Sequence, residues 1–163
     1  MNYLNILDCD ILDGNGVRVT LFVSGCPHHC EGCHNKESWD AFNGKEFTQD
    51  TVQKILKALD RDYIDGLTLS GGDPLFIQNR LEITKLCKEV KKAFPNKTIW
   101  LYTGYNYEEV ETLEVFEYVD VLVDGKFKLD LRDVSLAFRG SSNQRVIDVQ
   151  KTRKNGNIVL YME

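Results

Sequence analysis

Three cysteines, Cys26, Cys30 and Cys33, lie within eight residues of the chain in the order C-x3-C-x2-C. Cysteine thiolates are the usual protein ligands of iron–sulfur clusters, and most such clusters take four of them. This group supplies three, so one iron of a cluster bound here would lack a protein ligand. An open metal position is where a substrate can bind. The spacing therefore predicts a reactive cluster, and it disfavours a plain electron-transfer iron–sulfur protein.

Zinc is the alternative metal for the same thiolates. A Cys3His zinc site could recruit His28, His29 or His34, all of which lie close in sequence. A small zinc-binding interaction module therefore stays open as a function of another class. Zinc sites usually draw their ligands as two separated pairs, whereas the other cysteines, Cys9 and Cys87, are isolated, which favours the cluster. An odd cysteine count and short loops argue against disulfides.

Length and composition indicate one globular domain that covers residues 1–163. Hydrophobic residues make up 42% of the chain and charged residues 28%, which is ordinary for such a domain. The net charge of -5 comes without a basic stripe, so we expect no nucleic acid partner. No apolar run has the length of a membrane span, and the N-terminus lacks a signal-peptide pattern. We therefore expect no membrane partner and a cytoplasmic location, where thiols stay reduced.

Strand and helix patterns alternate along the chain. Apolar and β-branched residues predict strands over 17–23, 66–70, 98–102 and 118–123, with further strands near 144–149 and 157–162. Helical spacing predicts one helix capped by Thr48 and a longer one, with Cys87 on its apolar face, that ends before Pro95. Asn106 and Glu109 resemble a capping box for a third helix. This rhythm is typical of an α/β fold with a mostly parallel sheet covered by helices.

Four of the predicted strands run into loops that carry glycine or polar residues. The cysteine loop follows the first strand, and the next three are followed by Ser70-Gly71-Gly72-Asp73-Pro74, Thr103-Gly104-Tyr105 and Asp124-Gly125-Lys126. Each loop alone is a weak signal, since Gly-Gly is most often a simple turn. Because ligands bind at the carboxyl ends of parallel strands, we expect the four loops to build a single site.

The cysteine loop, the Gly-Gly-Asp loop and the βα rhythm together resemble the radical S-adenosylmethionine enzymes over nearly the whole chain. The stretch from Asp13 to Trp39 is similar to the activating enzymes of glycyl-radical proteins. The small size and residues 139–145 resemble, more narrowly, those that activate anaerobic ribonucleoside-triphosphate reductase. The resemblance implies a partial, open βα barrel of the radical S-adenosylmethionine type, in a single domain.

The resemblance also implies an activity and its partners. A 4Fe–4S cluster would cleave S-adenosylmethionine reductively, and the resulting 5′-deoxyadenosyl radical would generate a glycyl radical on the large subunit of the anaerobic reductase. Pyruvate formate-lyase or another glycyl-radical enzyme is the alternative target, and a flavodoxin-like protein is the implied electron donor. A complete barrel needs about 250 residues. The shorter chain would leave an open side, which suits a protein substrate better than a free metabolite.

The site residues follow from the same resemblance. Three irons would be bound by Cys26, Cys30 and Cys33, and the fourth iron would bind the amino and carboxylate groups of S-adenosylmethionine. The expected contacts to S-adenosylmethionine are those to its amino group from Gly71, Gly72 and Asp73, to its adenine from Gly32, Cys33 and His34, and to its ribose and carboxylate from Asp124 and Lys126. No catalytic side chain is expected beyond the cluster.

This chain departs from the family pattern at two of these positions. Asp73 stands where the family usually has glutamate, which shortens the reach of the carboxylate by one methylene group. Gly32 stands where many members carry an aromatic residue, so adenine packing would pass to His34. For Asp124 and Lys126 a solvated turn is an equal alternative. Three arginines are expected to form surface or structural ion pairs rather than to dock a partner: Arg18, Arg139 and Arg145.

Overall fold

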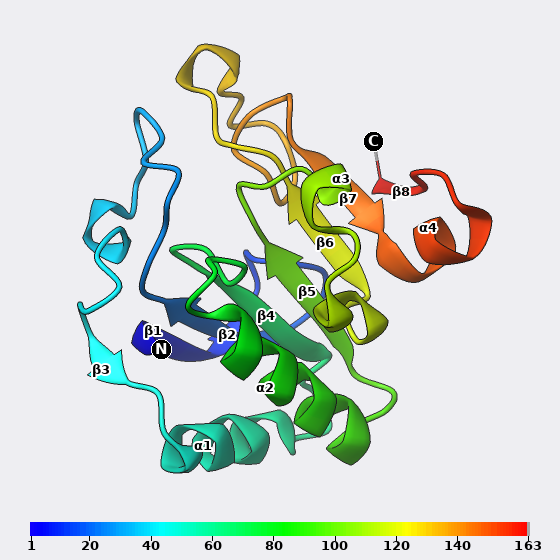
Figure 1. The fold of residues 1–163 in the computed structure, drawn as a ribbon. Coiled ribbons are helices and arrows are strands. Elements are labelled where there is room, and N and C mark those ends of the chain that lie inside the picture. The colour runs from blue at the N-terminus through cyan, green and yellow to red at the C-terminus, as the bar shows by residue number, and fades with distance from the viewer. Residues whose placement is uncertain (163) are drawn as a thin grey trace.

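The computed structural model describes residues 1–162, in which eight strands form one mixed sheet (Figure 1). The order of the strands across the sheet is β3-β1-β2-β4-β5-β6-β7-β8. Their bounds are β1 Asn2–Asp10, β2 Arg18–Val23, β3 Lys45–Glu46, β4 Gly66–Gly71, β5 Thr98–Tyr102, β6 Val121–Asp124, β7 Arg145–Asp148 and β8 Leu160–Met162. The helices of this part of the chain are α1 Gln49–Leu59, α2 Arg80–Ala93, α3 Tyr107–Val110 and α4 Val149–Asn155.

Only the centre of the sheet is parallel. Strands β2, β4, β5 and β6 pair in parallel, whereas β1, β3, β7 and β8 join the sheet through antiparallel pairs. The α/β class and the open sheet are confirmed, but the expectation of a mostly parallel sheet holds only for these four central strands. A parallel pair needs a crossover of a dozen or more residues, usually with a helix. The connection of β1 to β2, residues 11–17, is too short for one and simply reverses the chain.

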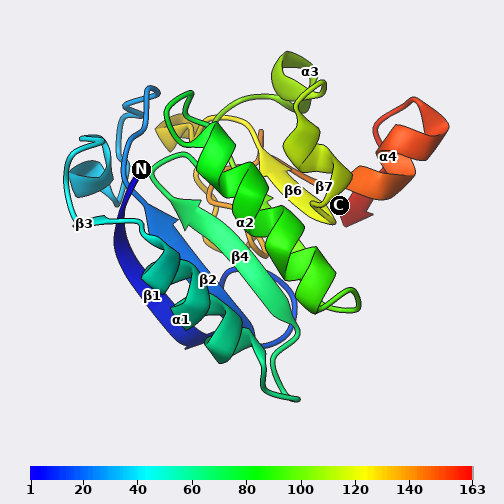
Figure 2. The same cartoon turned by 60° about the horizontal axis from the view of Figure 1, so that its bottom comes forward.

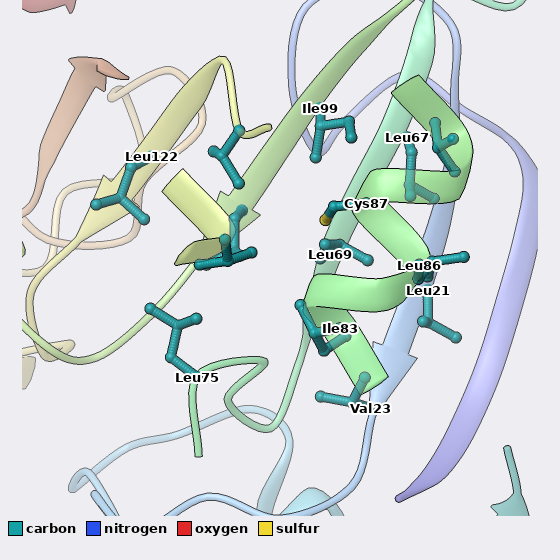
Figure 3. Packing of buried hydrophobic residues seen from close by; sticks show 14 of the residues in the cluster. Leu21, Val23, Leu67, Leu69, Leu75, Ile83, Leu86, Cys87, Ile99 and Leu122 are labelled. Atoms are coloured by element: carbon teal, nitrogen blue, oxygen red, sulfur yellow. The ribbon is translucent and has the colours of Figure 1, made fainter. Parts of the chain in front are cut away.

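Helices α1 and α2 cover one face of the sheet (Figure 2). The core lies between them and the strands, where α2 directs Ile83, Leu86 and Cys87 onto β2 and β4 (Figure 3). The Cys87 side chain is 0% exposed, which confirms it as a core residue. Burial of a leucine-sized side chain contributes about 1.5–3 kcal/mol relative to exposure. This packing therefore fixes the central strands whose carboxyl ends carry the loops.

Within residues 1–162, no crossover helix covers the other face of the sheet near its centre. A small apolar cluster there consists of Trp100, Val121, Val123 and Val146, with partly buried neighbours that include Tyr102 and Phe138. Phe138 belongs to the segment 125–144 between β6 and β7, which Figure 1 draws in yellow to orange above the sheet. Its ring meets that of Trp100 edge to face, with centroids 5.0 Å apart. The segment thus folds back over the carboxyl ends of the parallel strands.

Most of the predicted elements are present, with shifted ends. The expected strands correspond to β2, β4, β5, β6, β7 and β8, and the two long helices to α1 and α2. The capping box at Asn106 and Glu109 is formed, but α3 ends after one turn, at Val110. The pattern of the sequence did not reveal β1, β3 or α4. Nothing in residues 1–162 forms a helix with the length and apolar character that a bilayer span requires.

Candidate functional site

A cavity of about 430 Å³ lies at the carboxyl ends of the parallel strands. All four loops expected at this edge reach its wall, together with the segment 125–144. The cavity brings together seven of the predicted site residues: Cys26, Cys30, Cys33, His34, Gly71, Gly72 and Asp73. The four strand-end loops therefore meet at one cavity, as expected.

The cysteine loop leaves β2 and is closed at its base by backbone contacts with residues 38 and 39. The N–H of Gly25 donates to the carbonyl of Ser38 at 2.6 Å, and that of Cys26 to the carbonyl of Trp39 at 3.4 Å. At the other end of the loop, the Asn35 N–H points at the sulfur of Cys33 at 3.4 Å. The three thiols are unpaired, partly exposed and on the wall of one cavity.

This donor set fits a cluster of several irons. Burial raises the pKa of Cys26 to about 11, and burial likewise raises the pKa of Cys30. The polypeptide alone thus favours neutral thiols, and bound iron would have to displace the protons. Within residues 1–162 no three His, Cys, Asp or Glu side chains are placed to hold a single metal ion. Three thiols spread around a cavity are what a cluster requires, because each binds a different iron.

The Gly-Gly-Asp loop after β4 is tied to the start of the cysteine loop by the backbone. The N–H of Gly72 donates to the carbonyl of Val23 at 2.8 Å, and the N–H of Asp73 to that of Gly25, also at 2.8 Å. Asn79, just before α2, adds a side-chain hydrogen bond from Nδ2 to the carbonyl of Ser24 at 2.9 Å. The two loops that the resemblance assigns to cluster and cofactor are therefore packed directly on each other.

The side chain of Asp73 is 1% exposed, and its carboxylate is fully engaged by the protein. Four donors surround it: the N–H of Leu75 at 2.8 Å, the hydroxyl of Thr103 at 2.9 Å, the N–H of Gly104 at 3.0 Å and Nε2 of His28 at 2.6 Å. These donors come from three different loops. The structure therefore turns both carboxylate oxygens toward protein groups.

The floor of the cavity holds polar side chains that the site prediction did not include. Asp13 lines it, and its pKa is raised to about 7, first by burial and then by the hydrogen bond and charge of neighbouring Asp10. The hydroxyl of Tyr102 is buried and has no hydrogen-bond partner among the described residues. Tyr102 could have been found from the strand pattern, because positions 100 and 102 of β5 share the face opposite the helices.

Three predicted residues lie outside the cavity wall. Asp124 is 0% exposed and accepts hydrogen bonds from the Arg145 guanidinium, at 3.1 Å and 2.5 Å, and from the N–H of Tyr107 at 2.8 Å. Lys126 is exposed, although Gly125 between the two lines the cavity. Gly32 has φ +76, and a Cβ there would lie 2.9 Å from a methyl group of Leu129. A turn that needs positive φ explains why no aromatic residue stands at that position.

The three arginines differ in environment. Arg145 forms the expected ion pairs, with Asp124 and Glu108. Arg18 is 1% exposed and forms no ion pair within residues 1–162, because its guanidinium donates to backbone carbonyls and to the hydroxyls of Thr68 and Thr98. It ties β2 to β4 and β5 without a carboxylate, so the ion-pair expectation was wrong for this residue. Arg139 lines the cavity and donates to the carbonyl of Gln144 at 2.7 Å.

Comparison with known proteins agrees with this site. Residues 12–147 match the family model of the 4Fe-4S single cluster domain, which contains all three clustered cysteines. The cluster interpretation is thereby supported over the zinc alternative, and the chain is an iron–sulfur domain protein by class.

Curated relatives define the family more narrowly. The anaerobic ribonucleoside-triphosphate reductase-activating protein of Enterobacteria phage T4 is 52% identical over 146 residues, which cover 90% of this chain and 93% of that protein. The protein of the same name from Escherichia coli K12 is 46% identical over 150 residues, covering 90% and 97%, and that from Vibrio cholerae is 43% identical over 148 residues, covering 88% and 96%. This chain belongs to the family of anaerobic ribonucleoside-triphosphate reductase-activating proteins.

Proposed function

We propose that this chain is a radical S-adenosylmethionine activase that generates a glycyl radical on the large subunit of anaerobic ribonucleoside-triphosphate reductase. The observation that carries the proposal is the shared cavity of the three thiols and the Gly-Gly-Asp loop. A site for S-adenosylmethionine at an open iron needs both. The names of relatives at 43–52% identity support the choice of target.

In this proposal the cysteine loop binds the cluster, and the Gly-Gly-Asp loop contributes to the binding of S-adenosylmethionine. Cys26, Cys30 and Cys33 would hold a 4Fe–4S cluster and leave one iron open to S-adenosylmethionine. When bound, the cluster would supply the electron, received from an external donor, for reductive cleavage of S-adenosylmethionine, the chemistry by which hydrogen would be removed from the target glycine. Gly71 and Gly72 bring backbone groups close to the methionine amino group.

The other side chains of the cavity wall would orient the nucleoside part of S-adenosylmethionine and keep water out of the site. His34 lies on the cavity wall beside Cys33, with its ring 6.3 Å from that of Phe127, and would contact the adenine. Phe127 and Phe138, from the segment 125–144, add an apolar surface to the cavity wall. A reactive primary radical needs such a dry surrounding, because side reactions are otherwise fast. Asp124 and Lys126 stay proposed contacts to ribose and carboxylate, reached only if the loop after β6 moves.

The experiment starts from protein reconstituted without oxygen with iron and sulfide. With a one-electron reductant and S-adenosylmethionine, 5′-deoxyadenosine should form, and addition of the reductase large subunit should give a glycyl doublet by electron paramagnetic resonance. Cys30→Ala should abolish both signals because it removes a cluster ligand, whereas Cys9→Ala, an exposed cysteine outside the site, should retain them.

Pyruvate formate-lyase serves as the alternative target in the same experiment. A doublet on that protein and none on the reductase would overturn the proposed partner while keeping the chemistry. A colourless preparation with stoichiometric zinc and no 5′-deoxyadenosine would overturn the chemistry itself. A flavodoxin-like donor is proposed as the physiological reductant, and replacement of the chemical reductant by reduced flavodoxin tests it.

A further inference from the structure

His28, between the first two cysteines, is held by two loops other than its own. Its Nε2 donates to Oδ2 of Asp73 at 2.6 Å, and its side chain is only 6% exposed. One side of the ring meets Tyr105 edge to face, with centroids 4.6 Å apart. The ring also occupies the space above Gly104, where a Cβ would lie 2.4 Å from the imidazole. The position thus admits an imidazole only because residue 104 has no side chain.

This contact is the one that fixes the middle of the cysteine loop to the Gly-Gly-Asp loop. The backbone hydrogen bonds between the two loops involve only residues 23, 25, 72 and 73, at the base. Among the described side chains of residues 27 to 34, His28 alone has a hydrogen bond to the Gly-Gly-Asp loop. The position of Cys30 and Cys33 relative to the Gly-Gly-Asp loop therefore depends on His28, while stacking of His29 on Trp39 and the Asn35 N–H hold the loop on its other side.

We infer that His28 is a positioning residue: through Asp73 it sets the distance between the cluster-binding loop and the glycine backbone that receives S-adenosylmethionine. The inference rests on the proposed function and assigns Asp73 a different task from direct contact with the ligand. Because the Asp73 carboxylate already has four protein donors, the amino group of the ligand is left to the backbone of Gly71 and Gly72. The shorter aspartate leaves room for the imidazole.

The geometry predicts a specific kinetic effect. The amino end of S-adenosylmethionine would bridge the two loops, because its amino group would meet both the open iron and the backbone of Gly71 and Gly72. A displacement of about 1 Å between catalytic groups can cost on the order of 100-fold in rate. Loss of the His28 contact should therefore weaken ligand binding without removing a cluster ligand.

Three variants test this. His28→Ala removes the contact, His28→Gln restores an N–H donor at similar reach, and Glu31→Gln is the matched control in the same loop. Glu31 is exposed, whereas His29 is unsuited as a control because its ring stacks on that of Trp39, with centroids 4.4 Å apart. After reconstitution, His28→Ala should keep its iron and sulfide but show a KM for S-adenosylmethionine raised about tenfold or more. In a titration followed by electron paramagnetic resonance, the spectral change of its reduced cluster should require a correspondingly higher concentration of S-adenosylmethionine. His28→Gln and Glu31→Gln should stay within about threefold of the parent protein.

Each contrary result has one meaning. An unchanged KM and spectrum in His28→Ala would overturn the inference, as would a His28→Gln variant as impaired as His28→Ala. Loss of iron to the extent caused by Cys30→Ala would assign His28 to cluster ligation and overturn it as well.

Amide hydrogen exchange of the cluster-free chain separates this inference from the proposed function. His28→Ala should speed exchange in residues 26–34 and leave α2 unchanged, even if the parent protein were to make no 5′-deoxyadenosine. Equal exchange in both proteins would overturn the inference whatever the activity.

Discussion

Asp73 and Asp124 follow parallel strands at the same edge of the sheet, yet the protein uses them differently. Asp73 lies in the cavity wall, where donors from three loops surround it. Asp124 lies outside the wall and is paired with the guanidinium of Arg145. The same residue type at equivalent strand ends thus joins loops around the cavity in one case and stabilises the fold behind it in the other.

Asp73→Ala should give the largest effect. It leaves buried donors of Leu75, Thr103 and Gly104 without an acceptor and frees His28. We expect cleavage of S-adenosylmethionine per bound cluster to fall on the order of 100-fold. Single-turnover formation of 5′-deoxyadenosine, normalised to iron content, measures it. An undiminished rate would show that Asp73 positions nothing at the site.

Arg145→Gln should instead act on stability. It leaves Asp124 buried without its cation, and breaking such a pair typically costs about 3 kcal/mol or more. Because Arg145 is 31% exposed at its side chain, we expect a loss of about 2 kcal/mol in the free energy of unfolding, measured with urea. The rate of cleavage per cluster should remain within about twofold of the parent value. A selective rise in KM with full stability would place this ion pair in the site.

Asp13 sharpens the comparison because it lies in the same cavity as Asp73, with its pKa raised to about 7 by burial and by Asp10. The folded protein therefore binds a proton that the unfolded chain has lost between about pH 4 and 7, so this residue lowers stability as pH rises through that range. Asp13→Asn should be more stable than the parent at pH 8, by on the order of 1 kcal/mol, and equal to it near pH 4. Urea unfolding of the cluster-free proteins at both pH values checks this. A gain that is the same at both would contradict the raised pKa.

The effect with the least consequence for activity or stability concerns the thiols. Since burial raises the pKa of Cys26 to about 11, its thiolate population at pH 8 should be about a hundredfold below that of an ordinary cysteine. Alkylation of Cys26 in the cluster-free chain should be correspondingly slow and should increase about tenfold per pH unit up to pH 10. Peptide mass spectrometry resolves each cysteine, and a rate that levels off below pH 9 would contradict this.

Periodic patterns predicted the central strands, the two long helices and the edge of the sheet at which the loops gather. Strand β1 was not predicted, because only two of its nine residues are buried, so it lacks a regular apolar alternation. Spacing alone could predict that Cys26, Cys30 and Cys33 gather at one cavity, since the three residues are local in sequence. The hydrogen-bond partners of Asp73 and Asp124 could not be predicted in this way. They lie up to 45 residues away in the sequence, and the contacts depend on how the strands align in the sheet.

The late position of the segment 125–144 in the chain has a consequence for when, during synthesis, a cofactor could be inserted. The cysteines lie near residue 30, but Phe127, Phe138 and Gln144 come more than 90 positions later. A nascent chain that has emerged from the ribosome only through α2 would present three sulfurs to bulk water on the side where these residues belong. Maturation with iron should accordingly follow translation, and a fragment that stops before residue 125 should acquire a labile, oxygen-sensitive cluster at best.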